Sequence, residues 1–167
     1  RINWDTIIFV SLFHIIAVVS LFMMNWASFG ALLLTWWLSG SLGIGLGYHR
    51  QLTHKGFKSP RWVMRTLATF GALSLQSGPI AWVTTHRLHH AFTDTDRDPH
   101  SPRNGGYWAH IGWIFRGTSQ VQPQSVVEKY SPDLVKDPYL VWLDKFYYVP
   151  TVIVAAITFA IGGLPMM

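Results

Sequence analysis

Long apolar stretches at both ends of the chain predict membrane-spanning helices. Residues 6–48 contain no Lys, Arg, Asp or Glu, and one span needs about 20 apolar residues. The stretch is therefore long enough for two spans, and Asn25 and Trp26 near its middle are the natural turn between them. We expect spanning helices at about 5–24 and 27–47, joined as a hairpin whose ends return to the same side.

A polar region follows the hairpin and leads into another apolar stretch. Residues 84–145 are rich in Pro, Gly and Trp and carry most of the acidic side chains, whereas no charged residue follows them. We expect a polar or interfacial region over about 48–145 and a third span at about 146–165. The fold class is then an all-α, polytopic membrane protein. Because the chain begins with Arg and ends in an apolar run, we expect residues 1–167 to be part of one longer membrane domain.

The segment 62–83 is apolar but interrupted. Arg65 breaks it early and Ser77-Gly78-Pro79 breaks it late, so only residues 66–76 form a clean apolar run. That run is too short to cross a bilayer. We expect an interfacial or re-entrant helix here.

Five histidines lie beyond the polar end of the second expected span, in two clusters. His49 and His54 form an HxxxxH pattern, and His86, His89 and His90 form an HxxHH pattern. Positions i, i+3 and i+4 share one face of a helix, so the last three should point the same way. On an ideal α-helix His49 and His54 lie roughly 140° apart. They converge only if the helix frays there or if they bind different metals.

The distribution of charge predicts which side of the membrane these clusters face. Residues 50–145 hold twelve of the 13 Lys and Arg residues and seven of the eight Asp and Glu residues. Short loops rich in Lys and Arg stay in the cytoplasm, so we expect both clusters there, provided that 62–83 does not cross. Only 13% of the residues are charged, which favours a membrane protein over a nucleic-acid binder.

The histidines indicate a metal site. Neutral imidazole is the commonest protein ligand for metals, and three side by side suit iron, zinc or copper. No Glu lies inside either pattern, which argues against an HExxH zinc hydrolase. Asp94-x-Asp96-x-Asp98 resembles the start of a calcium loop, but Pro99 stands where an EF-hand requires Gly. Asp94 and Asp98 are candidates to accept the free imidazole N–H groups; a role as plain solvated acids stays open.

Three stretches of this chain are similar to the membrane-bound fatty-acyl desaturases, in particular to their Δ9, stearoyl-type branch. They are LGYHRQLTHKGFKSP (46–60), QSGPIAWVTTHRLHHAFTDTDRDPHSP (76–102) and GGYWAHIGWIF (105–115). The resemblance runs from about Leu42 to Phe115 and is far more specific than a bare histidine pattern. It implies an oxidoreductase in which two iron ions, with O₂ and two electrons, remove two hydrogens from an unactivated acyl chain.

The resemblance also assigns roles to single residues. It implies that Gln76 and Trp82 line the bend of the acyl tunnel beside the metals. The iron ligands that it implies are His49, His54, His86, His89 and His90. His100 and His110 match family positions that are not ligands, so we do not expect them to bind iron.

The chain departs from the family pattern in two ways. It lacks the family's third histidine box, so we expect residues 1–167 alone to have an incomplete di-iron site and to be inactive. The HxxxxH and HxxHH patterns correspond to the family's first and second histidine boxes. Acyl-CoA desaturases of the family carry a charged pair just before the second box, and this pair holds the CoA head group. Thr84 and Thr85 occupy those positions, which favours an acyl chain esterified to a membrane glycerolipid, as in bacterial and photosynthetic enzymes.

The implied partners are a membrane lipid acyl chain, O₂ and an electron donor, for which we expect ferredoxin in preference to cytochrome b5. Two alternatives keep the metal site: a histidine-box hydroxylase of acyl chains, and a desaturase of acyl-CoA. An alternative of another class is a metal-transporting membrane protein. Its histidines should line the spanning helices, and only His14 lies in the middle of one.

Overall fold

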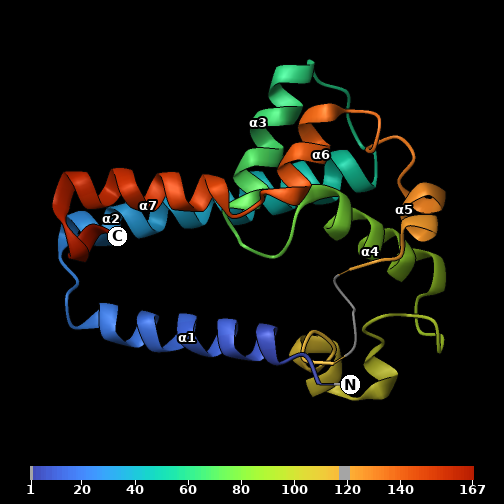
Figure 1. The fold of residues 1–167 in the computed structure, drawn as a ribbon, viewed down its shortest axis with the longest axis horizontal. Coiled ribbons are helices and arrows are strands. Elements are labelled where there is room, and N and C mark those ends of the chain that lie inside the picture. Colours follow the sequence, from blue (N-terminus) through green and yellow to red (C-terminus); the bar gives the residue numbers. More distant parts are fainter. Residues whose placement is uncertain (1, 117–120) are drawn as a thin grey trace.

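The computed structural model describes residues 2–116 and 121–167, which form helices joined by short turns (Figure 1). These residues contain no β-sheet and a single isolated antiparallel bridge, between Ile2 and Arg116. The all-α fold expected from the sequence is confirmed. The helices are α1 (Trp4–Leu21), α2 (Trp26–Trp36), the π-helix η1 (Trp37–Thr53), α3 (Arg61–Ala72), α4 (Pro79–Phe92), the 3₁₀ turn η2 (Pro102–Asn104), the short π-helix η3 (Trp108–Gly112), α5 (Gln124–Tyr130), α6 (Pro138–Lys145), α7 (Val149–Gly162) and the 3₁₀ turn η4 (Leu164–Met166).

The expected hairpin is formed by α1 and by α2, which continues without a break into η1. Asn25 begins α2: its side chain accepts from the backbone N–H of Ser28 at 3.0 Å, and the Ser28 hydroxyl accepts from the Asn25 N–H at 2.9 Å. This reciprocal capping satisfies donors that the first turn of a helix leaves free. Both helices of the hairpin are long and apolar enough to cross a membrane, and a third such segment exists if α6 and α7, bent by 68°, form one broken span.

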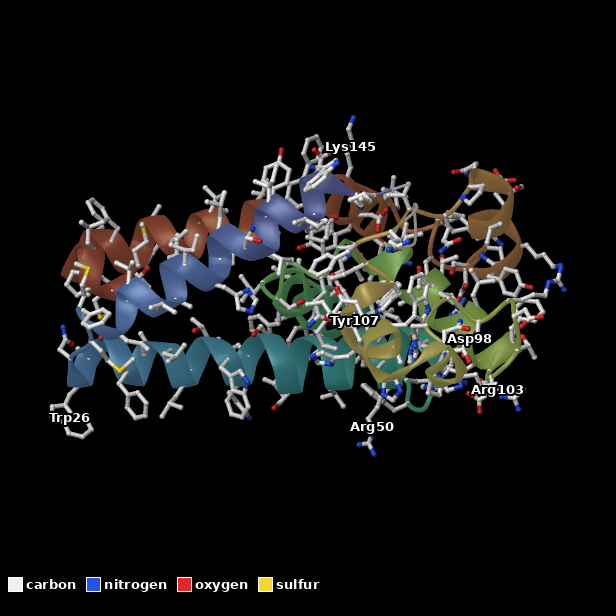
Figure 2. The ribbon with its side chains drawn as sticks, turned by 90° about the horizontal axis from the view of Figure 1, so that it is seen from below. Trp26, Arg50, Asp98, Arg103, Tyr107 and Lys145 are labelled. Atoms are coloured by element: carbon white, nitrogen blue, oxygen red, sulfur yellow. The ribbon has the colours of Figure 1, made fainter. Side chains whose placement is uncertain are left out.

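The molecule has an apolar end and a polar end. Helices α1, α2 and α7 extend along its long axis, whereas α3 to α6 gather at the other end (Figure 1). Trp26 marks the tip of the hairpin, far from Arg50 and Arg103 (Figure 2). No residue of α1 is buried, and its exposed side chains are mostly apolar, as a lipid-facing helix requires. A mainly apolar cavity of about 1000 Å³ lies between α1, α2 and α7.

The segment 62–83 forms two helices rather than one. Helix α3 ends at Ala72 and α4 begins at Pro79, because Leu75 and Ser77 between them adopt left-handed backbone angles, with φ of 54° and 98°. Proline is favoured in the first turn of a helix, where its missing N–H is not needed. With 12 residues, α3 is only about 18 Å long. It is too short to cross a bilayer.

Glycines allow η1 to lie directly against α3. A Cβ on Gly43 would overlap the backbone of Phe70 and Gly71, and a Cβ on Gly71 would overlap the ring of Tyr48. The two helix backbones therefore touch at a distance that only glycine permits. Tyr48 is fully buried in this contact. The packing fixes the end of η1, and with it the first histidine pair, relative to α3.

Replacing Gly43 with alanine should destabilise the protein, because the new methyl group meets backbone atoms that cannot rotate away. We expect a loss of about 1–3 kcal/mol, as for other overpacked sites, seen as a lower thermal midpoint of the detergent-solubilised protein. Gly30→Ala in α2 is the matched control, since a Cβ there meets nothing within 4 Å. A Gly43→Ala protein as stable as the Gly30→Ala protein would show that the contact is not tight.

The fold also predicts that the loops after η1 and after α4 lie on one side of the membrane. Lys58 and Arg103 are both exposed at the polar end, and Phe22 is 87% exposed at the hairpin tip. The chain has no cysteine, so single cysteines at these positions report without background. A membrane-impermeant maleimide should label positions 58 and 103 from one side and position 22 from the other. Labelling of 58 and 103 from opposite sides contradicts the fold.

Candidate metal centre

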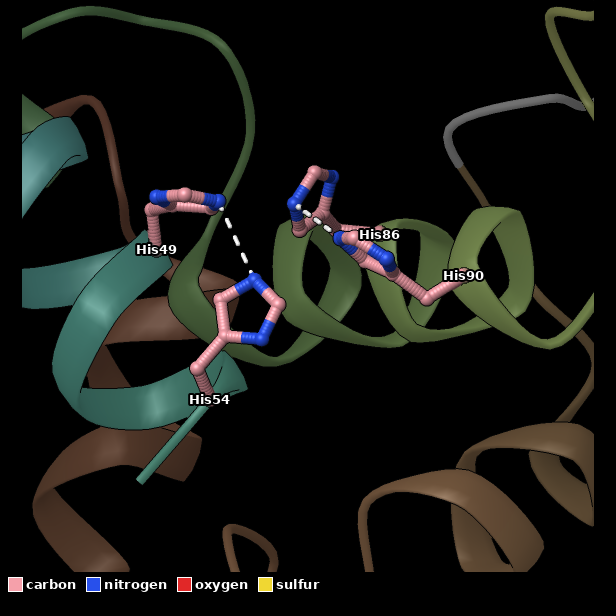
Figure 3. Close-up of side chains that lie close together, drawn as sticks. All are labelled: His49, His54, His86 and His90. Atoms are coloured by element: carbon pink, nitrogen blue, oxygen red, sulfur yellow. Dashed lines mark hydrogen bonds between the residues drawn. The ribbon is translucent and has the colours of Figure 1, made fainter. Parts of the chain in front are cut away.

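Four of the five predicted ligand histidines converge at the polar end of the spanning helices. His49 lies in η1, His54 follows its last residue, and His86 and His90 project from α4 (Figure 3). One ring nitrogen from each lies within 4.8 Å of the corresponding atom of the others. The Nε2 atoms of His49 and His54 are 3.1 Å apart, and those of His86 and His90 are 3.2 Å apart. We call these four residues the four-histidine cluster.

His49 and His54 meet because η1 is a π-helix. The backbone N–H of His54 donates to the carbonyl oxygen of His49 at 3.1 Å, which is the i to i+5 bond of that helix type. The wider turn brings residues five apart toward the same side of the helix, whereas on an α-helix they lie roughly 140° apart. The expectation that the pair converges only through fraying or through separate metals is wrong, since it assumed α-helical pitch.

His89 lies on α4 with His86 and His90 but serves a second position. Its Nδ1 lies 2.9 Å from Oδ1 of Asp98, and its ring is not part of the four-histidine cluster. Asp98 is only 4% exposed. Burial opposes ionisation of Asp98, but hydrogen bonds from His89 and from the backbone N–H groups of His100 and Asp94 outweigh it and lower its pKa. An ionised carboxylate only accepts, so His89 carries its proton on Nδ1 and leaves Nε2 free to bind a metal.

The two candidate acids therefore differ. Asp94 adopts a left-handed conformation with φ of 59° and donates its backbone N–H to Asp98 Oδ2 at 3.1 Å, whereas its own carboxylate forms no hydrogen bond or ion pair within residues 2–116 and 121–167. His100 is not an expected iron ligand, and its ring stacks on His89 with centroids 4.2 Å apart. His89, Asp98 and His100 together form a second group of potential ligands. The Asp98-x-His100 spacing is the only sequence signal for it.

Trp82 and Gln76 connect the cluster to the apolar cavity. The ring of Trp82 lies against His86, with centroids 4.8 Å apart, and against Tyr48 at 5.7 Å. Its indole Nε1–H donates to Gln76 Oε1 at 3.3 Å. Gln76 in turn lines the cavity between the spanning helices. Through these contacts Trp82 and Gln76 join the four-histidine cluster to the cavity, and their assignment to an acyl tunnel stays a prediction.

The surroundings of His86 and His90 favour the neutral form of both rings. Burial, and then the neighbouring histidines beginning with His90, lower the pKa of His86 to about 3. Burial and the surrounding histidines also lower the pKa of His90. The neutral ring is the form that binds metals. A set of four nitrogen donors without thiolate fits one iron, zinc or copper ion, so the residues present fit the iron that the resemblance implies.

Comparison with known proteins identifies the family. Residues 7–167 match the family model described as fatty acid desaturase. The chain belongs to the fatty acid desaturase family. It is 40% identical over 168 residues to the sn-2 palmitoyl-lipid 9-desaturase of Nostoc sp. (strain 36), a match that covers 100% of this chain and 59% of the relative. It is 38% identical to the sn-1 stearoyl-lipid 9-desaturase of Anabaena variabilis, over 98% of this chain and 60% of the relative.

Relatives with a different named substrate match over a similar share of the chain. The icosanoyl-CoA 5-desaturase of Limnanthes douglasii is 38% identical over 91% of this chain and 43% of its own length. The chain therefore spans about 60% or less of the length of the relatives named here. The resemblance found in the sequence is confirmed at the level of the family.

The two threonines before the HxxHH pattern are not open to solvent. Thr84 is fully buried and its hydroxyl lies 2.7 Å from the hydroxyl of Ser131. Thr85 is 6% exposed and accepts from Gln122 Nε2 at 3.3 Å. Both face the protein interior, so in the described part of the chain they provide no charge and no open surface for a polyanionic head group.

Asp98→Asn should weaken metal binding by this protein, because a neutral amide accepts the His89 N–H less strongly than a carboxylate and no longer fixes the tautomer. We expect a loss of about 10–100-fold in metal affinity, typical for a partner of a ligating histidine. Asp94→Asn is the matched control: its carboxylate has no such bond, and asparagine tolerates the left-handed backbone. Iron content by elemental analysis and Co²⁺ titration of the purified protein measure both. Equal losses in the two variants would rule out the special role of Asp98.

Proposed function

We propose that the protein is the histidine-box part of an iron- and O₂-dependent fatty-acyl desaturase that introduces a cis double bond at Δ9 of a saturated acyl chain. The observation that carries the proposal is the convergence of four imidazoles, with ligand atoms within 4.8 Å of one another, at the polar end of helices apolar enough to cross a membrane. An acyl chain in the bilayer and a polar metal site at its surface need this arrangement.

In this proposal two iron ions are held by the histidines. The four-histidine cluster (His49, His54, His86 and His90) holds one ion, and His89, oriented by Asp98, binds the other. The remaining ligands of the second ion come from the family's third histidine box, which residues 1–167 do not contain. When bound, the irons supply the oxidising power by which O₂ and two electrons remove two hydrogens from the chain.

The residues of this chain bind and place the substrate. The cavity between α1, α2 and α7 is mainly apolar and favours an acyl chain by about 0.8 kcal/mol for each methylene buried. Gln76 lines the cavity, and Trp82 contacts both Gln76 and His86, so in this proposal the two side chains set how far the chain enters. The apolar lining also keeps water away from the reacting carbons.

A lipid-bound acyl chain is the substrate that we propose. The cyanobacterial relatives at 38–40% identity are named for palmitoyl-lipid and stearoyl-lipid, and the buried, neutral Thr84 and Thr85 offer nothing to the phosphates of CoA, which need cationic or charge-assisted contacts. Acyl-CoA is the second candidate, because the Limnanthes douglasii relative is named for icosanoyl-CoA.

The proposed setting is an integral membrane protein with the histidines on the cytoplasmic side. The excess of Lys and Arg in residues 50–145 supports that side. Ferredoxin is the proposed electron donor, in preference to cytochrome b5. Substitution of one soluble donor for the other in reconstituted membranes tests this choice.

One assay separates the candidates. Membranes containing the complete protein, ferredoxin and a reductant receive labelled stearoyl-glycerolipid or labelled stearoyl-CoA, with transacylation blocked, and products are identified by mass spectrometry. We expect a Δ9 double bond, formed faster from the glycerolipid, and none with His86→Ala. His110→Ala is the matched control, since His110 is exposed in η3 and belongs to neither group of potential metal ligands. A hydroxylated product, or faster conversion of the CoA ester, would replace the proposal with the corresponding alternative.

A further inference from the structure

An arginine inside the second histidine box is bonded to the first box. Arg87 follows His86 on α4, and its side chain is only 14% exposed. Its Nη1 donates to Asp133 Oδ1 and to the Tyr130 carbonyl, both at 2.7 Å. Its Nη2 donates to Asp133 Oδ2 at 3.0 Å and to the Leu52 carbonyl at 2.6 Å. Each terminal nitrogen of the guanidinium thus donates to one oxygen of Asp133 and to one backbone carbonyl.

The partners of Arg87 lie next to the ligands of the other box. Leu52 stands between His49 and His54 near the end of η1, where helix carbonyls lack partners within the helix. Asp133 also pairs with Lys55, the residue after His54, at 3.1 Å. The two boxes are therefore joined twice, directly through the Leu52 carbonyl and indirectly through Asp133.

The connection between the two boxes consists of charged groups, Arg87, Lys55 and Asp133. Burial opposes ionisation of Asp133, but the hydrogen bonds from Arg87 and Lys55 outweigh it and lower its pKa to about 2. Bidentate bonds between a guanidinium and a carboxylate are directional as well as strong. A lysine could replace the charge of Arg87 but not its planar fork.

We propose that Arg87 and Asp133 are positioning residues that set the spacing of the two histidine boxes, so that His86 and His90 reach the same ion as His49 and His54. The inference rests on the proposed function, since it concerns the metal that the cluster holds. Helix α4 is also fixed at its start, where Asp144 accepts from the N–H groups of Ile80 and Ala81 at 2.8 and 2.9 Å. That anchor is about 15 Å along the helix from His90. Arg87 instead fixes α4 directly beside His86.

A second pair of the same chemistry provides the control. Arg65 on α3 donates to both carboxylate oxygens of Asp137 at 3.0 and 3.2 Å. It joins the 131–145 segment to α3 as Arg87 joins it to α4, but it contacts neither histidine box. Loss of either pair should lower stability, whereas only the loss of the Arg87 pair should disturb the metal site.

The test compares Arg87→Gln, Arg87→Lys and Asp133→Asn with Arg65→Gln and Asp137→Asn in the complete purified protein. Thermal midpoints report stability, and Co²⁺ titration followed by its visible absorption reports affinity and ligand geometry. We expect similar drops in midpoint for the two arginine-to-glutamine variants, but at least tenfold weaker Co²⁺ binding and an altered spectrum only for Arg87→Gln. Arg87→Lys should recover part of the midpoint and little of the affinity.

Asp133→Asn is the milder variant if Arg87→Gln does not fold, because Arg87 keeps its bonds to the two carbonyls. Its loss of Co²⁺ affinity should be smaller. The double variant, Arg87→Gln with Asp133→Asn, should bind Co²⁺ no more weakly than Arg87→Gln alone, as expected for two residues that act through the same ion pair. Unchanged Co²⁺ affinity and spectrum in the Arg87 and Asp133 variants overturn the inference and leave the proposed function standing. A wild-type protein that binds no Co²⁺ overturns the proposed function, and the inference with it.

Discussion

The i to i+5 hydrogen bonding of η1 determines where the first two histidines lie, and the remaining site is arranged around them. The bond from the His54 N–H to the His49 carbonyl closes the last turn and brings the two rings together edge to face, with centroids 4.6 Å apart. The same helix places Gly43 against the backbone of α3. The ligand pair is therefore carried on a helix that is itself immobilised, which is how a site holds its geometry before the metal arrives.

The polar end is held together by carboxylates from one short segment. Between Ser131 and Lys145, Asp133 binds Arg87, Asp137 binds Arg65, and Asp144 binds the first N–H groups of α4. Each carboxylate leaves bulk water and is compensated by a cation or by backbone donors, as a desolvated charge requires. The spanning helices pack mainly through apolar surface that lipid also satisfies. Directional bonds therefore fix α3 and α4 to the segment 131–145 and α4 to the end of η1, whereas the glycine contact fixes η1 against α3.

The sequence was sufficient where the determining physics is local. Apolar stretches and the expected turn at Asn25 and Trp26 predicted the hairpin. The i, i+3, i+4 spacing predicted that all three histidines of α4 point the same way, but only His86 and His90 join one cluster, whereas His89 bonds to Asp98. The sequence was insufficient where the helix type or contacts between distant residues determine the position of a side chain. Residue spacing alone does not reveal that η1 is a π-helix, so the convergence of His49 with His54 was missed. The left-handed turn that separates the role of Asp98 from that of Asp94 was equally hidden.

The cluster favours a multivalent cation over protons for a simple electrostatic reason. A protonated ring is disfavoured by burial and is then repelled by any proton on the neighbouring rings. Both causes lower the pKa of His86 to about 3. A single divalent ion accepts lone pairs from all four rings at once, so the crowding that opposes protonation favours metal binding. Because Trp82 lies against His86 and bonds to Gln76 at the cavity wall, the ring positions that suit the ion also shape the end of the cavity. One tryptophan thus connects the four-histidine cluster to the wall of the cavity.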